Sequence, residues 1–123
     1  MDENGFQKTI RDAEMLYDMA MEEKDRNLRD AAEKAWGAVA RATDALIIKR
    51  LGISEAPDPR KRGDWLWNLV KRNPGLKNML AFYESSASIL HGGCFYNDIC
   101  EPEEKIKFYI SLAKEYIEQV KVV

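Results

Sequence analysis

The residues that could do chemistry gather in one short stretch, SILHGGCFYNDICEPEE, at positions 88–104. It holds the only histidine of the chain, both of its cysteines and two adjacent glycines: His91, Cys94, Cys100, Gly92 and Gly93. Segments with a helical pattern flank it on both sides. A metal site, a catalytic loop, or a helix end followed by a turn would each account for this concentration of residue types.

A zinc site is the least favoured of the three. Zinc sites built from cysteine commonly place the paired thiols roughly two to four residues apart. Cys94 and Cys100 are separated by five residues, and no second pair of cysteine or histidine ligands exists elsewhere in the chain. We therefore expect no metal. The cysteines are interpreted as small buried hydrophobic residues, although disulfides do occur in intracellular proteins of hyperthermophiles.

A catalytic loop is the second possibility, with His91 as the candidate catalytic residue. Its imidazole would act as a general acid or base, and Tyr96, Asn97 and Asp98 would assist it or bind phosphate. No glycine-rich phosphate loop, HExxH pair or nucleophile elbow accompanies these residues. We therefore expect no cofactor.

The interpretation we favour for the stretch is structural. A helix would end at His91, whose ring would interact with the last carbonyls. Gly92 and Gly93 would then adopt the positive φ angles that a helix C-cap prefers. Phe95 and Tyr96 would pin the following turn to the rest of the protein.

Outside this stretch, apolar residues recur at alternating steps of three and four, which indicates amphipathic helices. The clearest pattern is the seam Leu28, Ala32, Ala35, Val39, Ala42 and Leu46. We predict helices over residues 6–24, 27–52, 64–72, 76–91 and 102–121, and no strand. Gly52 is expected to end the second helix, and Asp64 to cap the third. The sequence therefore predicts an all-α fold, an up-and-down bundle of four long helices plus one short helix, in a single domain over residues 1–123.

The second helix also suggests partners and binding residues. Its alanine seam and the side of Trp36 carry more apolar surface than a small monomer is expected to cover, so we predict a homodimer. Glu33 and Lys34 could form a polar pair in a cleft, and tryptophans could stack on a base, although most aromatic residues of amphipathic helices lie in the core. The candidate ligand-binding residues are Glu33, Lys34, Trp36, His91, Tyr96 and Asn97.

The charges are unevenly distributed along the chain. The net charge is only −2, which argues against general binding of polyanions. Residues 49–78, however, carry +5, and the remainder carries −7. A local basic patch or an ordinary solvated surface would both fit. No apolar run approaches the roughly 20 residues that span a bilayer, and no secretory signal opens the chain, so we expect a cytoplasmic protein without membrane contact.

Two segments, AAEKAWGAVARATDALI (31–47) and ESSASILHGGCFYNDICEPEEKIKFYISLAKEYIEQV (84–120), resemble the archaeal PaREP family. That family is placed with the HEPN domains (higher eukaryotes and prokaryotes nucleotide-binding). The resemblance runs over nearly the whole chain in order, from an acidic first helix to a final amphipathic helix. It implies an HEPN-like all-α bundle that is often dimeric.

The same resemblance bears on catalysis. Active HEPN ribonucleases use an arginine, then four to six residues, then a histidine. With His91 as that histidine, the arginine positions hold Glu84, Ser85 and Ser86. Our first hypothesis is therefore a non-catalytic, dimeric binding module for a nucleotide, a nucleic acid or a protein partner. The alternative is a toxin-like HEPN ribonuclease with a displaced basic residue, Arg72 or Lys77, supplied from the partner subunit.

Overall fold

The computed structural model describes residues 4–123, which form helices and no strand. The α-helices are α1 (Gly5–Glu23), α2 (Leu28–Leu51), α3 (Arg62–Arg72), α4 (Lys77–Ser86) and α5 (Glu103–Val122). Short 3-10 turns, η1 (Pro59–Lys61) and η2 (Pro74–Leu76), lead into α3 and α4, and the π-helical segment η3 (Ala87–Tyr96) continues α4. The predicted all-α fold is confirmed. None of these helices combines the length and apolarity needed to cross a membrane.

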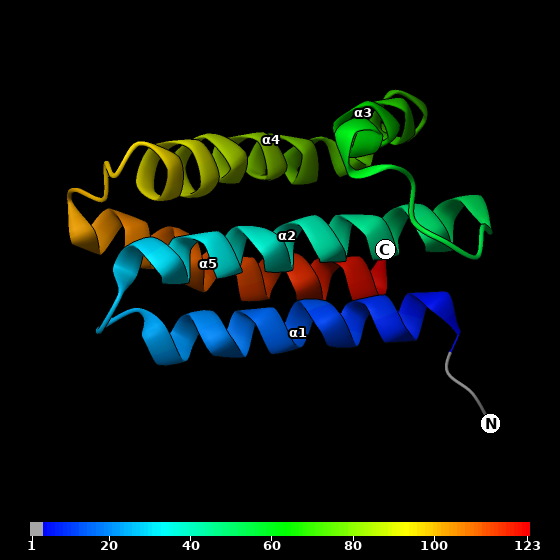
Figure 1. Cartoon of the computed structure of the whole chain (residues 1–123). Coiled ribbons are helices and arrows are strands. Elements are labelled where there is room, and N and C mark those ends of the chain that lie inside the picture. Colours follow the sequence, from blue (N-terminus) through cyan, green and yellow to red (C-terminus); the bar gives the residue numbers. More distant parts are fainter. Residues whose placement is uncertain (1–3) are drawn as a thin grey trace.

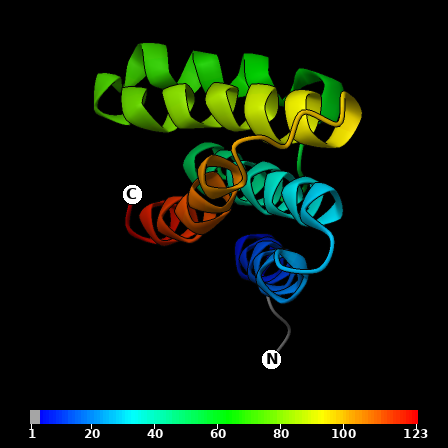
Figure 2. The same cartoon turned by 90° about the vertical axis from the view of Figure 1, so that its left-hand side faces the viewer.

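The helices are arranged in layers around α2. α1 lies on one side of the pair formed by α2 and α5, and α3, α4 and η3 lie on the other (Figure 1). α4 and η3 cross over that pair obliquely (Figure 2). α2 contacts every other α-helix and η3, so it is the centre of the fold.

Small residues allow α2 to occupy this central position. Its fully buried alanines are Ala31, Ala32, Ala35, Ala38, Ala42 and Ala45. At Gly37 the helices approach so closely that an added Cβ would lie 3.3 Å from the side chain of Leu16 on α1. The apolar surface of α2 is therefore covered by helices of the same chain. That surface was the reason for expecting a homodimer, and it does not require a second subunit.

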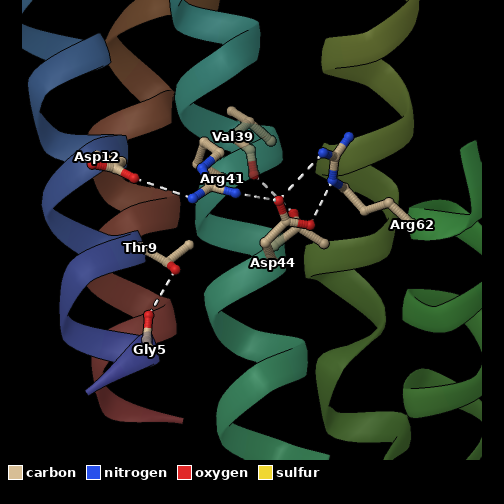
Figure 3. A network of polar contacts seen from close by, with 8 residues as sticks. Gly5, Thr9, Asp12, Val39, Arg41, Asp44 and Arg62 are labelled. Atoms are coloured by element: carbon tan, nitrogen blue, oxygen red, sulfur yellow. Dashed lines mark hydrogen bonds and ion pairs between the residues drawn. The ribbon is translucent and has the colours of Figure 1, made fainter. Parts of the chain in front are cut away.

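A buried carboxylate joins three of the helices. Asp44 on α2 is only 1% exposed. Its Oδ1 accepts a hydrogen bond of 2.8 Å from Nε of Arg62 on α3, and its Oδ2 lies 3.0 Å from Nη1 of Arg41. Arg41 also reaches Asp12 on α1, at 3.1 Å (Figure 3). Burial opposes the charge of Arg62, but the hydrogen bond and charge of Asp44 prevail and raise the pKa of the guanidinium.

A second buried polar contact ties α2 to α5. The hydroxyl of Thr43 donates to the carbonyl of Val39, at 2.8 Å, so it accepts from the phenol of Tyr116, at 2.6 Å. Tyr116 is buried, and burial raises the pKa of its phenol above the ordinary value. The phenol therefore stays neutral and satisfied in the core.

The predicted helix boundaries hold at most ends, with two corrections near α3. Gly52 ends α2 as predicted, with a left-handed φ of 65°. Asp64, however, does not cap α3, because the helix already begins at Arg62 and Asp64 lies in its first turn. The cap is supplied earlier: Asp58 accepts from the backbone N–H of Arg60 and starts the 3-10 turn that runs into α3.

The largest correction concerns Gly92 and Gly93, which do not end a helix. The helix continues as η3 to Tyr96, and positive φ among residues 4–123 occurs instead at Gly52 and Asp98. An added Cβ at Gly93 would lie 3.1 Å from the carbonyl oxygen of Ser88, five residues earlier. The glycine thus admits the wider turn of a π-helix, in which each N–H bonds to the carbonyl five residues before it.

Trp67 also departs from prediction. Trp36 and Trp65 pack against the core, as predicted for aromatic residues of amphipathic helices. Trp67 instead lies on the outer face of α3 and is 51% exposed.

Replacing Asp44 with alanine should lower the free energy of unfolding by about 3 to 5 kcal/mol, because Arg62 would keep a buried charge without its carboxylate. The matched control is Asp12→Ala, which removes the exposed end of the same chain of ion pairs and should cost about 1 kcal/mol or less. Urea unfolding followed by circular dichroism measures both. An equal loss of unfolding free energy in the two variants would contradict the central role of Asp44.

Candidate functional site

The two cysteines form a disulfide that closes the turn after η3. Cys94 is fully buried at the last turn of η3, and the Cα atoms of Cys94 and Cys100 lie 4.4 Å apart. Cys94 is thus buried as predicted, whereas Cys100 is only partly buried, and the disulfide settles the oxidation state that the sequence left open. Asp98 explains the proximity: it adopts a left-handed conformation, φ 56°, which turns the chain back toward η3.

His91 is paired with Glu33 of α2 across the interface with η3. Its Nδ1 lies 2.7 Å and 3.1 Å from the two carboxylate oxygens of Glu33. The prediction that the imidazole binds helix-end carbonyls is thus wrong. A carboxylate only accepts, so Nδ1 carries the proton and Nε2 keeps the lone pair in the neutral ring. The imidazole is 38% exposed, which leaves it accessible from solvent.

Aromatic rings surround this pair. The ring of His91 lies 6.0 Å from that of Trp36 and 6.3 Å from that of Phe95, which it meets at a shallow angle. Tyr96 meets it edge-on at 5.3 Å and is itself 68% exposed. We call this group, Glu33, Trp36, His91, Phe95 and Tyr96, the α2–η3 site.

Arg29 completes the edge of the site and was not predicted. Its Nε donates to the carbonyl of Phe95 and its Nη2 to that of Tyr96, so it caps the end of η3. The spacing of Arg29, Glu33 and Trp36 places them on one face of a helix, and this is the signal that would have found Arg29. The analysis of α2 followed its apolar seam instead.

Two of the predicted binding residues lie outside the site. Lys34 is turned toward α1, where its Nζ bonds to Glu23, and it also bonds to Asp30 one turn earlier on α2. Asn97 has a structural contact: its side-chain amide donates to the carbonyl of Gly92 at 2.7 Å and helps to end η3. The structure therefore brings together Glu33, Trp36, His91 and Tyr96 of the predicted set.

None of the five hollows described on residues 4–123 is lined by Glu33, His91 or Tyr96. Arg72 and Lys77, the basic residues considered for catalysis, lie before α4 or at its start. Lys77 lies fourteen positions before His91 along the helix, a rise of roughly 20 Å. Within one chain these cations cannot serve a phosphate held at His91.

Comparison with known proteins identifies the family but adds no characterised relative. No curated protein and no solved structure matches the chain. A family model described as the archaeal PaREP1/PaREP8 family matches residues 8–117, which include every residue of the α2–η3 site. The chain belongs to the archaeal PaREP1/PaREP8 family.

Proposed function

We propose that the protein is a non-catalytic, HEPN-like binding module that recognises the base of a nucleotide at the α2–η3 site. The observation that carries the proposal is the Glu33–His91 pair, which holds Nδ1 at the carboxylate and, in the neutral ring, leaves Nε2 as an acceptor at a half-exposed surface. Nε2 can accept a hydrogen bond from an exocyclic amine of a base. The exposed ring of Tyr96 offers a face for stacking.

The charges of the site favour the base over the phosphate as the recognised group. Glu33 places a carboxylate at the centre of the site. Arg29 is the nearest cation described there, and its guanidinium is held by the carbonyls at the end of η3. A phosphate would meet the carboxylate without a dedicated cation, whereas a neutral base would not meet that repulsion.

The same distribution argues against cleavage of RNA. His91 could act as a base, since Glu33 orients it, but stabilising the charge that develops on phosphorus requires a donor aimed at it. Among residues 4–123 the basic residues considered for that role lie at the other end of α4. The ribonuclease alternative therefore depends on Arg29, whose guanidinium is bound to the carbonyls at the end of η3, or on a cation from a second subunit.

Titration with adenosine monophosphate should shift the imidazole signals of His91 in a proton–carbon spectrum, where the only histidine of the chain is assigned without ambiguity. Ribose 5-phosphate, which lacks the base, should not shift them. Tyr96→Ala should weaken binding about five- to a hundredfold, the range for loss of one stacking contact. Lys34→Ala is the matched control, because Lys34 is next to Glu33 in sequence but faces α1. Signals that respond equally to both probes would contradict base recognition.

An RNA cleavage assay should show no activity for the wild type, with or without a chelator. The reason is that Arg29, the cation described at the site, is bound to the carbonyls at the end of η3 rather than aimed at His91. Such an aimed donor is worth about 3 to 4 kcal/mol in comparable sites. His91→Ala and Lys77→Ala are assayed beside it. Robust cleavage that disappears in His91→Ala would establish the ribonuclease alternative.

The proposal includes a homodimer, for which α1 now offers the support that α2 does not. Met15 and Met19 are one turn apart on its outer face, 57% and 41% exposed. They line a shallow hollow with Leu16 and with the ion-paired Asp12 and Arg41. Adjacent exposed apolar side chains over such a hollow are typical of surfaces that associate.

Light scattering at tens of micromolar should give about twice the chain mass of 14.2 kDa. Met15→Glu combined with Met19→Glu should return the mass to that of one chain, because charge would enter an apolar contact. Phe108→Glu, at an exposed apolar residue of α5, is the control and should leave the dimer intact. A wild-type mass near that of one chain would count against the dimer.

A further inference from the structure

A second surface, on α3, combines an exposed tryptophan with basic side chains. Trp67 lies on the outer face of this helix, and Nζ of Lys71, one turn later, sits 5.8 Å from the centre of its ring. Asn68 and Arg72 line a groove of about 290 Å³ with Leu51, Trp65 and Leu69, on the flank of α3 that is turned away from Trp67. We call Trp67, Asn68, Lys71 and Arg72, together with this groove, the α3 face.

The cations of the α3 face are available to a ligand. Elsewhere in the basic segment, Arg62 is bound to Asp44 and Arg60 to Asp58. Lys71 and Arg72 are exposed and make no ion pair with any residue from 4 to 123. The surrounding segment, residues 49–78, carries +5 in a chain whose net charge is −2. A polyanion would therefore be drawn to this face and repelled by the rest of the molecule.

We propose that the α3 face binds a single-stranded polynucleotide. Trp67 would stack on one base, Lys71 would move from the ring to a neighbouring phosphate, and Arg72 would contact the next phosphate beside the groove. Exposed aromatic rings interleaved with cations are what sequence-tolerant binding of single strands requires, since every base has a face to stack and every linkage a charge. A duplex would not serve, because its bases are already stacked on one another.

The alternative occupant is an apolar protein surface, including a second copy of this chain. The charges favour the strand. Burying Lys71 and Arg72 against an apolar partner would remove their hydration without compensation, whereas phosphates compensate both. The inference is independent of base recognition at the α2–η3 site, because the two surfaces lie at opposite ends of α4 and η3 (Figure 1).

The test is fluorescence anisotropy of the full chain with a labelled oligouridylate of about twelve nucleotides, within the roughly 4 to 16 that single-strand binding domains cover. Trp67→Ala should weaken binding about five- to a hundredfold, and Trp67→Phe should retain most of it. Lys71→Glu with Arg72→Glu should abolish binding. The matched control is Lys105→Glu with Lys114→Glu, two exposed lysines of α5 that change the net charge equally and should reduce affinity far less.

Each further arm separates the proposal from its competitors. Binding of an oligothymidylate of the same length shows whether the protein prefers RNA or DNA. Binding of either strand supports the proposal. Equal affinity for a duplex, equal loss in the Lys105/Lys114 control, or an unchanged affinity in Trp67→Ala would overturn it. So would a change of oligomeric state in Trp67→Ala, which would make the α3 face a contact between subunits. A loss of strand binding in His91→Ala as large as that in Trp67→Ala would assign the strand to the α2–η3 site instead.

Discussion

The carboxylate of Asp44 is the interaction on which the arrangement of the helices depends. A charge on the buried face of α2 is tolerated only if it is compensated, because an ion in an apolar interior loses its hydration. Arg62 compensates it from α3, and Arg41 extends the pairing to Asp12 on α1. Apolar contacts alone would allow α3 to slide along α2 at little cost. We infer that the ion pairs fix the position at which these helices meet.

The same interior sets the geometry of the α2–η3 site. Tyr83 on α4 lies near Arg62, and while burial raises the pKa of its phenol, the charge of Arg62 acts in the opposite direction. The ring of Tyr83 is 5.2 Å from that of Trp36, which in turn is 6.0 Å from that of His91. Packed rings therefore run from the buried ion pairs to the imidazole. Tyr96, at the outer end, is left exposed.

The sequence predicted what depends on local periodicity. The seam on α2 and the stop at Gly52 needed only the spacing of apolar residues and one left-handed glycine. The π-helix η3 was not predicted, because hydrogen bonds to the fifth residue back do not show in a spacing of apolar residues by three and four. Gly92 and Gly93 were therefore interpreted as the end of a helix. The disulfide escaped because its closure depends on the conformation of one residue, Asp98.

The site itself was only partly predictable. His91 and Glu33 were both singled out, yet they lie 58 positions apart in the sequence. The residues around each of them do not indicate that the two side chains meet. Lys34 was grouped with Glu33 because the two are adjacent in sequence. On a helix, adjacent residues point about 100° apart, which is why one faces η3 and the other α1. The exposure of Trp67 was not predicted either. It depends on the orientation of α3, which the Arg62–Asp44 ion pair sets.

α4 and η3 separate the two surfaces by a continuous run of helix from Lys77 to Tyr96, roughly 25 to 30 Å long. At one end the segment that contains α3 carries the excess of cations, and at the other a carboxylate stands at the centre of the site. A strand attracted by its phosphates would therefore settle on α3, where charge dominates. A base reaching His91 would be selected by hydrogen bonding and stacking, which act only at contact. Under these two proposals, the cations of α3 attract a strand from a distance, and the contacts at His91 select its base. The two surfaces lie at different ends of one run of helix, so a strand that used both would lie along it.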